Sequence, residues 1–229
     1  MHGPKVIRRP AGWPVDRFSA IQPVWRADTV VCIGGGPSVT QGAVDSVRGR
    51  ARVIAVNNAY WLAPWADMLY FADGRWWEWH KDDPRYQAFA GQRVTIEGTG
   101  LNVADPDVHF LHNYSTTTGD QGGLSETPNG LRTGSNGGYQ AVNIATLAGT
   151  RRILLLGYDM RFVNGRSHWH GGHPAKVPES HYSVNYARYY ASMLPHLERL
   201  GVAVINCTPG SKLTAFPFLP LEDALPCTS

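Results

Sequence analysis

The chain has 229 residues, of which 43% are hydrophobic and 17% charged, and this composition excludes a disordered or fibrous protein. The formal net charge of +3 is mild and the basic residues are scattered, so a nucleic-acid partner is permitted but not indicated. Cys32, Cys207 and Cys227 are odd in number and far apart, which gives no disulfide framework and fits a reducing cytoplasm. The sequence shows no leader pattern and no run near the ~18 apolar residues of a membrane span. We therefore expect a cytoplasmic protein without a membrane span.

The first 27 residues differ in character from the rest of the chain. Residues 1–27 are rich in Pro, Arg and Trp without periodicity, so we expect an irregular N-terminal arm. Residues 28–229 alternate short apolar runs with helix-length segments. The expected strands are residues 29–33, 53–56, 68–71, 94–96, 108–111, 153–156 and 202–205. The expected helices are residues 41–48, 75–89, 138–148 and 180–200, the last one bent by Pro195.

Strands that alternate with helices imply right-handed βαβ units. We therefore predict an α/β fold with a Rossmann-like, doubly wound, mainly parallel sheet of about seven strands in a single domain. Residues 113–138 and 162–179 have no hydrophobic period and are expected to be long loops, which are usually functional or mobile. Nothing in this pattern selects between a monomer and a homo-oligomer.

The first strand runs directly into Gly-Gly-Gly-Pro-Ser at residues 34–38. Open α/β sheets bind ligands at the carboxyl ends of their strands, and a glycine turn before a helix suits a phosphate. The turn matches neither the dinucleotide fingerprint nor the Walker loop, and a plain tight turn is the alternative. The candidate nucleotide-binding residues here are Gly34, Gly35, Gly36 and Ser38.

The next two strands also end in polar residues at this edge. Asn57 and Asn58 follow the second strand, where their amides either read a base or ribose or serve as turn residues. Asp73 follows the third strand and is either a ligand-facing carboxylate or the N-cap of the next helix. Three tryptophans within residues 76–79 either stack on a ligand ring or pack the core.

A second turn of small residues precedes the helix at 138–148. Residues 132–139 read Arg-Thr-Gly-Ser-Asn-Gly-Gly-Tyr, and such a turn before a helix N-terminus also receives anions. The candidate residues are Ser135, Asn136, Gly137 and Gly138. The following strand ends in Gly-Tyr-Asp, which brings Asp159 to the same edge. Two such turns on one edge favour a nucleotide ligand.

Histidines are concentrated in the sequence Ser-His-Trp-His-Gly-Gly-His at residues 167–173. His168, His170 and His173 are candidate metal ligands, although no cysteine or nearby carboxylate completes a ligand set. An imidazole also suits proton transfer or phosphate binding. His181, which opens the last expected helix, is the candidate general base.

The order of these motifs carries a resemblance. The chain shows Gly-x-Gly-Pro-Ser, Asn-x-x-Tyr, Arg-Thr-Gly-Ser-Asn-Gly-Gly, Leu-x-Gly-Tyr-Asp and then a His before the last helix. Over residues 29–219 it resembles the bacterial lipooligosaccharide sialyltransferases, the motility-accessory-factor proteins and the archaeal 6-hydroxymethylpterin diphosphokinases. Its compact form and Ser-His-Trp loop are similar to proteins found in phage and prophage gene sets.

The resemblance implies a Rossmann-like nucleotide-binding domain over residues 28–229. It also implies a glycosyltransferase that uses a nucleotide-activated sugar donor, CMP-linked in the sialyltransferases, and needs neither a cofactor nor an Asp-x-Asp metal motif. Gly35 and Ser38 would hold the nucleotide, with Asn58 or its neighbour on the ribose or phosphate. Arg132 would line the donor pocket, and His181 would deprotonate the acceptor hydroxyl.

Departures from the family pattern leave alternatives open. Met160 and Arg161 stand where the sialyltransferases have an aromatic pair, so Arg161 would replace those hydroxyls and the donor sugar stays open. The acceptor would be a glycan or a modified nucleic-acid base. One alternative function is diphosphate transfer from ATP to a pterin-like alcohol, with Mg²⁺ on carboxylates such as Asp73 and Asp159. The other is a non-catalytic module that binds a nucleotide or nucleic acid.

Overall fold

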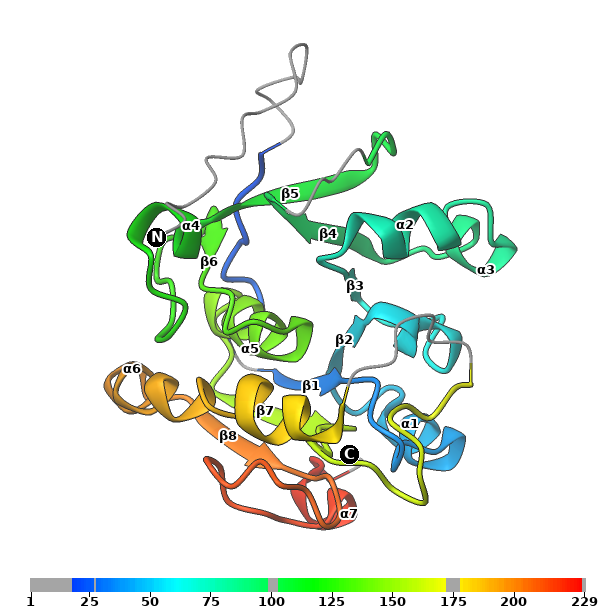
Figure 1. Ribbon diagram of the computed structural model, residues 1–229, viewed down its shortest axis with the longest axis vertical. Coiled ribbons are helices and arrows are strands. Elements are labelled where there is room, and N and C mark those ends of the chain that lie inside the picture. The colour runs from blue at the N-terminus through cyan, green and yellow to red at the C-terminus, as the bar shows by residue number, and fades with distance from the viewer. Residues whose placement is uncertain (1–17, 27, 99–102, 172–177, 228–229) are drawn as a thin grey trace.

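The computed structural model describes residues 18–26, 28–98, 103–171 and 178–227, and its centre is a sheet of eight parallel strands (Figure 1). The strands are β1 (Thr29–Ile33), β2 (Arg52–Val56), β3 (Met68–Tyr70), β4 (Gln92–Ile96), β5 (Val108–Asn113), β6 (Gly130–Leu131), β7 (Arg152–Leu156) and β8 (Ala203–Asn206). The predicted α/β, Rossmann-like, parallel architecture is confirmed.

The strands of the sheet lie on both sides of β1. Its order is β6-β5-β4-β3-β2-β1-β7-β8, so β2 to β6 are added on one side of β1 and β7 and β8 on the other. A reversal of this kind opens a crevice at the carboxyl ends of the two central strands. The crevice of this chain therefore lies beyond the ends of β1 and β7.

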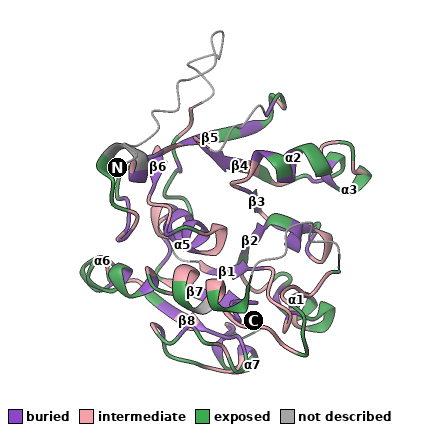
Figure 2. Ribbon diagram, viewed as in Figure 1, coloured by how far each residue is buried: buried purple, intermediate pink, exposed green. Residues whose placement is uncertain are grey.

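Helices cover both faces of the sheet. Val30 and Cys32 of β1 pack in one apolar cluster with α5 (Gly137–Leu147) and α6 (Leu194–Leu200). Val31 and Ile33 pack in the other with α1 (Gln41–Val47), α2 (Gly74–His80) and α3 (Pro84–Gln87). Successive side chains of a strand point to opposite faces, so a strand covered on both faces is apolar throughout. Figure 2 shows that the strands of the sheet are largely buried. The structure also has the short helices α4 (Tyr114–Thr118) and α7 (Leu221–Ala224).

All seven predicted strands are present, whereas two predicted helices differ from the structure. The segment 75–89 is divided into α2 and α3, because Asp83 caps a new helix that has Pro84 in its first turn. The segment 180–200 is not one bent helix. It comprises a π-helical turn η3 (His181–Tyr186), a 3₁₀ turn η4 (Tyr190–Met193) and α6, and Pro195 lies in the first turn of α6.

Of the predicted N-terminal arm, residues 1–27, the structure describes only residues 18–26. This segment lies against the sheet and α5. The Ser19 N–H donates to the Phe110 carbonyl at 3.0 Å, and the Trp25 N–H donates to the Ala148 carbonyl at 2.9 Å. Within the described part of the chain, no helix is long and apolar enough to span a bilayer.

One buried amide on α5 anchors the long segment between β5 and α5. The Asn143 side chain is fully buried, and its Nδ2 donates to the Ser125 carbonyl at 2.8 Å. Its Oδ1 accepts from the Ser125 N–H at 3.0 Å and from the Arg132 N–H at 3.2 Å. Because buried backbone groups need partners, this one side chain holds two separate points of the segment against the helix.

Replacing Asn143 with Ala is expected to lower the free energy of unfolding by roughly 3 kcal/mol, since it leaves three buried backbone groups without a partner. Urea denaturation followed by circular dichroism measures this change. The matched control is Thr146→Ala on the same helix, whose hydroxyl bonds only the Val142 carbonyl of its own turn. Equal losses in the two variants would contradict the anchoring role.

Candidate functional site

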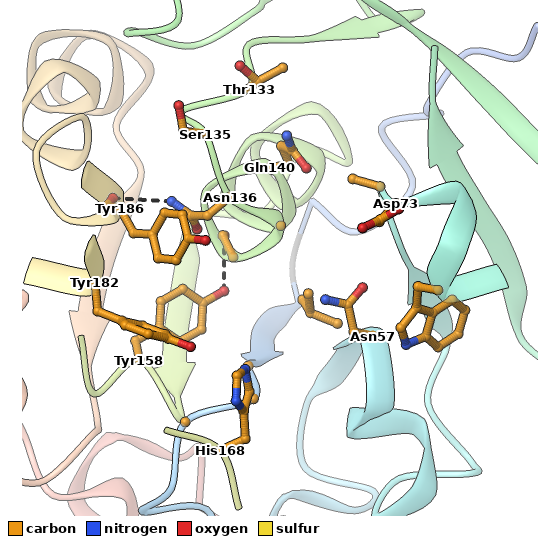
Figure 3. A pocket seen from close by; sticks show the side chains of 18 of the residues that line it. Asn57, Asp73, Thr133, Ser135, Asn136, Gln140, Tyr158, His168, Tyr182 and Tyr186 are labelled. Atoms are coloured by element: carbon orange, nitrogen blue, oxygen red, sulfur yellow. Dashed lines mark hydrogen bonds between the residues drawn. The ribbon is translucent and has the colours of Figure 1, made fainter. Parts of the chain in front are cut away.

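A cavity of about 1160 Å³ lies at the carboxyl edge of the sheet. It is lined by the first glycine turn after β1 and by the second turn, which opens α5. The two turns lie about 100 positions apart in the sequence, and the reversal of the strand order brings them together. Figure 3 shows Asn136, Tyr158, Tyr182 and Tyr186 on one side of this cavity and Asn57 and Asp73 on the other.

The first turn needs glycine because the end of β7 packs directly against it. The Gly36 N–H donates to the Gly157 carbonyl at 2.9 Å. A Cβ at Gly34 would lie 2.7 Å from that carbonyl oxygen, and a Cβ at Gly36 would lie 2.0 Å from Asp159 Oδ2. No side chain fits at either position without moving the backbone, so these glycines set the shape of the cavity floor.

Asp159 is a buried carboxylate in the cavity lining. Its side chain is 1% exposed, and its Oδ2 accepts a hydrogen bond of 2.9 Å from the Ser38 hydroxyl. Among the described residues, no hydrogen-bond partner reaches its Oδ1. Burial raises the pKa of Asp159, and the hydrogen bonds from Ser38 oppose that shift. Ser38 itself is not a lining residue, so it affects the cavity only by holding the Asp159 carboxylate in place.

The opposite wall is held by a closed network of Asn58, Trp76 and His80. Trp76 Nε1 donates to Asn58 Oδ1 at 2.7 Å, which fixes the orientation of the amide. His80 Nδ1 lies 2.6 Å from the Trp76 carbonyl and therefore carries the proton, while Nε2 accepts from Asn58 Nδ2 at 3.2 Å. The network requires a neutral imidazole, and desolvation by burial lowers the pKa of His80.

Replacing His80 with Gln is expected to remove part of the pH dependence of stability. The folded-state pKa lies below the ordinary value of 6.5, so the unfolded chain binds more protons as the pH falls through that value. The stability that neutral His80 contributes is present above pH 6.5 and is lost as the pH falls towards the folded-state pKa.

Unfolding free energies of the wild type and of His80→Gln, measured between about pH 5 and 8, test this expectation. The wild type should lose more stability on acidification than the variant. His109→Gln, at an exposed histidine whose Nδ1 lies 2.8 Å from the Ser19 hydroxyl, is the control and should follow the wild type. Parallel curves for the wild type and His80→Gln would contradict the role of the buried ring.

The N-terminus of α5 faces the cavity through Asn136, Gly137 and Gly138. Asn136 Oδ1 caps the helix by accepting from the Tyr139 N–H at 2.8 Å, and its Nδ2 donates to the Tyr186 carbonyl at 3.1 Å. A Cβ at Gly138 would lie 2.8 Å from Tyr158 Cε1. The first-turn N–H groups of a helix have no partner within it, so this end of the cavity attracts anions.

Three residues of the lining have backbone conformations that L-residues rarely adopt. Asn57, Ser135 and Met160 have φ angles of 51°, 63° and 50°. They follow β2, precede α5 and follow β7, respectively. Conformations of this kind cost energy and cluster at functional sites, which supports this edge as the site.

Tyrosines of the cavity wall were not predicted from the sequence. Tyr182 and Tyr186 line the cavity from η3, and their ring centroids lie 5.3 Å apart. Tyr158 also lines it, and its hydroxyl donates to the Gly138 carbonyl at 3.0 Å. An α-helix over 180–200 would also place positions 182 and 186 on one face, but the sequence pattern does not show that this face turns towards the cavity.

Most of the predicted site residues lie in this cavity. The predicted residues that line it are Gly34, Gly35, Gly36, Asn57, Asn58, Asp73, Ser135, Asn136, Gly137, Gly138, Asp159, Arg161, His168 and His170. The predicted residues that do not line it are Ser38, Arg132 and His181. His173 lies outside the described residues. Asp73 is also the N-cap of α2, as the alternative interpretation held.

Arg132 and His181 have other neighbours. The Arg132 guanidinium donates to the Asp120 carbonyl at 2.8 Å and to the Thr118 hydroxyl, which ties it to the segment after α4. His181 opens η3, and its Nδ1 lies 2.7 Å from Asn185 Nδ2. Both residues lie next to elements of the cavity wall without being part of its lining.

The described carboxylates and imidazoles were candidates for a metal centre. Among the described residues, no group of three or more His, Cys, Asp or Glu could hold a metal ion. The chain does contain one Asp-Pro-Asp at residues 105–107. It precedes β5, at the opposite end of the strand from the cavity, and Asp105 accepts from the Tyr86 hydroxyl at 2.8 Å. This Asp-x-Asp spacing is therefore no part of the candidate site.

The sheet order and the cavity at its reversal define a Rossmann-like, doubly wound α/β protein. This chain is structurally similar to the sialyltransferase CstII from Campylobacter jejuni, in complex with the substrate analogue cytidine-5'-monophosphate. The TM-score is 0.55 at 16% identity, over 85% of this chain and 86% of the other. It is also similar to the MAf glycosyltransferase from Magnetospirillum magneticum AMB-1, with a TM-score of 0.54 at 15% identity over 90% of this chain.

The chain spans only 35% of the length of the MAf glycosyltransferase. No protein-family profile and no curated protein sequence matches the chain. At these identities the similarity establishes the fold over most of the chain, which agrees with the resemblance found in the sequence motifs. The likeness to phage and prophage proteins receives no support from these comparisons.

Proposed function

We propose that this protein is a glycosyltransferase that binds a nucleotide-activated sugar donor in the cavity at the carboxyl edge of the sheet. The observation that carries the proposal is the convergence of two glycine-bearing turns and the α5 N-terminus on one cavity. Its volume of about 1160 Å³ exceeds that of a typical pocket for a drug-sized ligand, about 300–1,000 Å³. The names of the two structural neighbours, a glycosyltransferase and a sialyltransferase, agree with it.

The donor phosphate is assigned to the space between the first glycine turn and α5. Gly35 and Gly137 allow close approach of an anion to the backbone, and the helix dipole is favourable there. Asn57 and Asn58 on the opposite wall supply amide groups for the ribose or base. A CMP-linked donor is the first choice, because a structural neighbour was solved with cytidine-5'-monophosphate.

The acceptor is assigned to the part of the cavity beyond the ends of β3 to β6. This part is polar and is suited to a ligand with several hydroxyl groups, such as a glycan, and a modified nucleic-acid base is the alternative. The residues that line it include Asp73, Glu97, Asn113, Ser115, Gln121 and Thr133.

Titration of the purified protein with CMP, UDP, GDP and ATP by calorimetry tests the proposal. Binding of at least one nucleotide is expected, and the tightest identifies the donor class. Ser135, which lines the cavity beside α5, allows a matched pair of variants because Asp and Asn both tolerate its φ of 63°.

Ser135→Asp is expected to weaken nucleotide binding about tenfold relative to Ser135→Asn, because the two side chains differ only in charge next to the phosphate. If the wild type binds no nucleotide, the proposed function is contradicted. Equal affinities in the two variants would contradict the assignment of the donor phosphate to the N-terminus of α5.

Magnesium-dependent diphosphate transfer is a second candidate, favoured by one observation. Asp159 Oδ1 has no partner among the described residues, and a divalent cation usually bridges one or two carboxylates and the substrate phosphates. The other candidate ligand, Asp73, forms an ion pair in which its Oδ2 lies 2.8 Å from Nη2 of Arg75. ATP binding that is unchanged by chelation of Mg²⁺ would argue against this candidate.

His181 is proposed as the base that takes the proton of the acceptor hydroxyl, a role that requires its ring, which is outside the cavity lining, to turn towards the acceptor. Its Nδ1 is paired with the Asn185 amide, and reversal of that amide would let Asn185 accept the Nδ1 proton and leave Nε2 as the base. Replacing His181 with Ala should lower the turnover of the donor identified by calorimetry about 10²–10⁴-fold, with nucleotide affinity preserved. Unchanged turnover would assign proton transfer to another group, and no turnover in the wild type would favour a non-catalytic module.

A further inference from the structure

The histidine-rich loop reaches back onto the first glycine turn. It begins with a tight turn in which the N–H groups of Val163 and Arg166 each donate to the other's carbonyl at 3.0 Å. Beyond this turn, the Trp169 N–H donates to the Gly35 carbonyl at 3.2 Å. The Trp169 ring packs edge-on against Trp61, with centroids 6.1 Å apart. The loop is thus fixed at two points, on the glycine turn and on the 3₁₀ turn η2 (Asn57–Trp61) that follows β2.

These two contacts place the His168 ring directly over Gly35. A Cβ at Gly35 would lie 3.1 Å from His168 Cδ2 and 3.9 Å from Nε2, so the edge of the ring that carries Nε2 faces the turn. The other ring nitrogen, Nδ1, lies 2.9 Å from the Ser167 hydroxyl. Figure 3 shows the ring at one end of the cavity, between Tyr158 and Tyr182 on one side and Asn57 on the other.

The surroundings of His168 determine which chemistry it can perform. Among the described residues, which do not include His173, no group of three metal-binding side chains contains His168. His168 lines the cavity, so its ring is within reach of a ligand that binds at the first glycine turn. If the Ser167 hydroxyl donates to Nδ1, the ring proton resides on Nε2 and the imidazole is a hydrogen-bond donor at the turn.

We infer that His168 Nε2 donates a hydrogen bond to the donor phosphate that leaves during glycosyl transfer, an inference that rests on the proposed function. In that step the bond between the anomeric carbon and the phosphate oxygen breaks, and its electron pair goes to the oxygen. The acceptor oxygen forms the new bond to carbon, and its proton goes to the base. The N–H of His168 stabilises the negative charge that develops on the leaving phosphate.

If His168 donates to the phosphate, it contributes to the binding of a nucleotide and not to the binding of the nucleoside alone. The contribution of the phosphate is measured as the ratio of the dissociation constants of cytidine and CMP, or of the nucleoside–nucleotide pair that calorimetry selects. His168→Ala should reduce this ratio about 10- to 100-fold and leave nucleoside affinity unchanged, since a hydrogen bond to a charged group is lost. His168→Gln, whose amide nitrogen can reach the position of Nε2, should restore most of the ratio.

His196→Ala is the matched control, because His196 contacts Glu126 at 3.2 Å and does not line the cavity. A ratio in His168→Ala equal to that of the wild type would overturn the inference while the proposed function stands. An equal loss of affinity for nucleoside and nucleotide would also overturn it, because it would make His168 a residue that only shapes the cavity. A wild type that binds no nucleotide would overturn the proposed function, and the inference with it.

Discussion

The candidate site depends on one close contact, in which the turn after β1 packs against the turn after β7. The Gly36 N–H bonds the Gly157 carbonyl at 2.9 Å, and the Ser38 hydroxyl bonds the Asp159 carboxylate at 2.9 Å. The contact spans the point where the strand order reverses, so it closes the bottom of the crevice that the topology opens. Everything that lines the cavity, from Asn57 to Tyr186, is positioned around this closed floor.

The contact explains why the cavity combines conformational strain with a buried charge. Because glycine backbones pack without side chains between them, the Asp159 carboxylate lies within the wall and away from solvent, and its pKa is raised. Three non-glycine residues with positive φ also line the cavity. A fold bears such costs where a preformed arrangement of polar groups is useful, and the rest of the apolar sheet supplies the stability that offsets them.

The sequence was sufficient for the features that depend on local pattern. Buried parallel strands are continuous apolar runs, so seven strands were located, whereas the two-residue strand β6 has no run to detect. The glycine turns were found because they follow a strand or precede a helix directly. The positions of Arg132 and His181 relative to the cavity were not predictable, since they depend on side-chain partners such as Asp120 and Asn185. Tyr182 and Tyr186 were missed because the sequence pattern does not show which face of the segment 180–200 turns towards the cavity.

Helix α5 joins several parts of the molecule that are separate in the sequence. Its N-terminus opens on the cavity, Gln140 in its second turn accepts from the Tyr70 hydroxyl of β3 at 2.8 Å, and Asn143 holds the segment before it. A ligand that binds only the folded form raises its stability by mass action. Occupancy of the cavity is therefore thermodynamically linked to the ordering of β3 and of the segment that carries β6, so a thermal shift would register ligands even in variants that have lost all turnover.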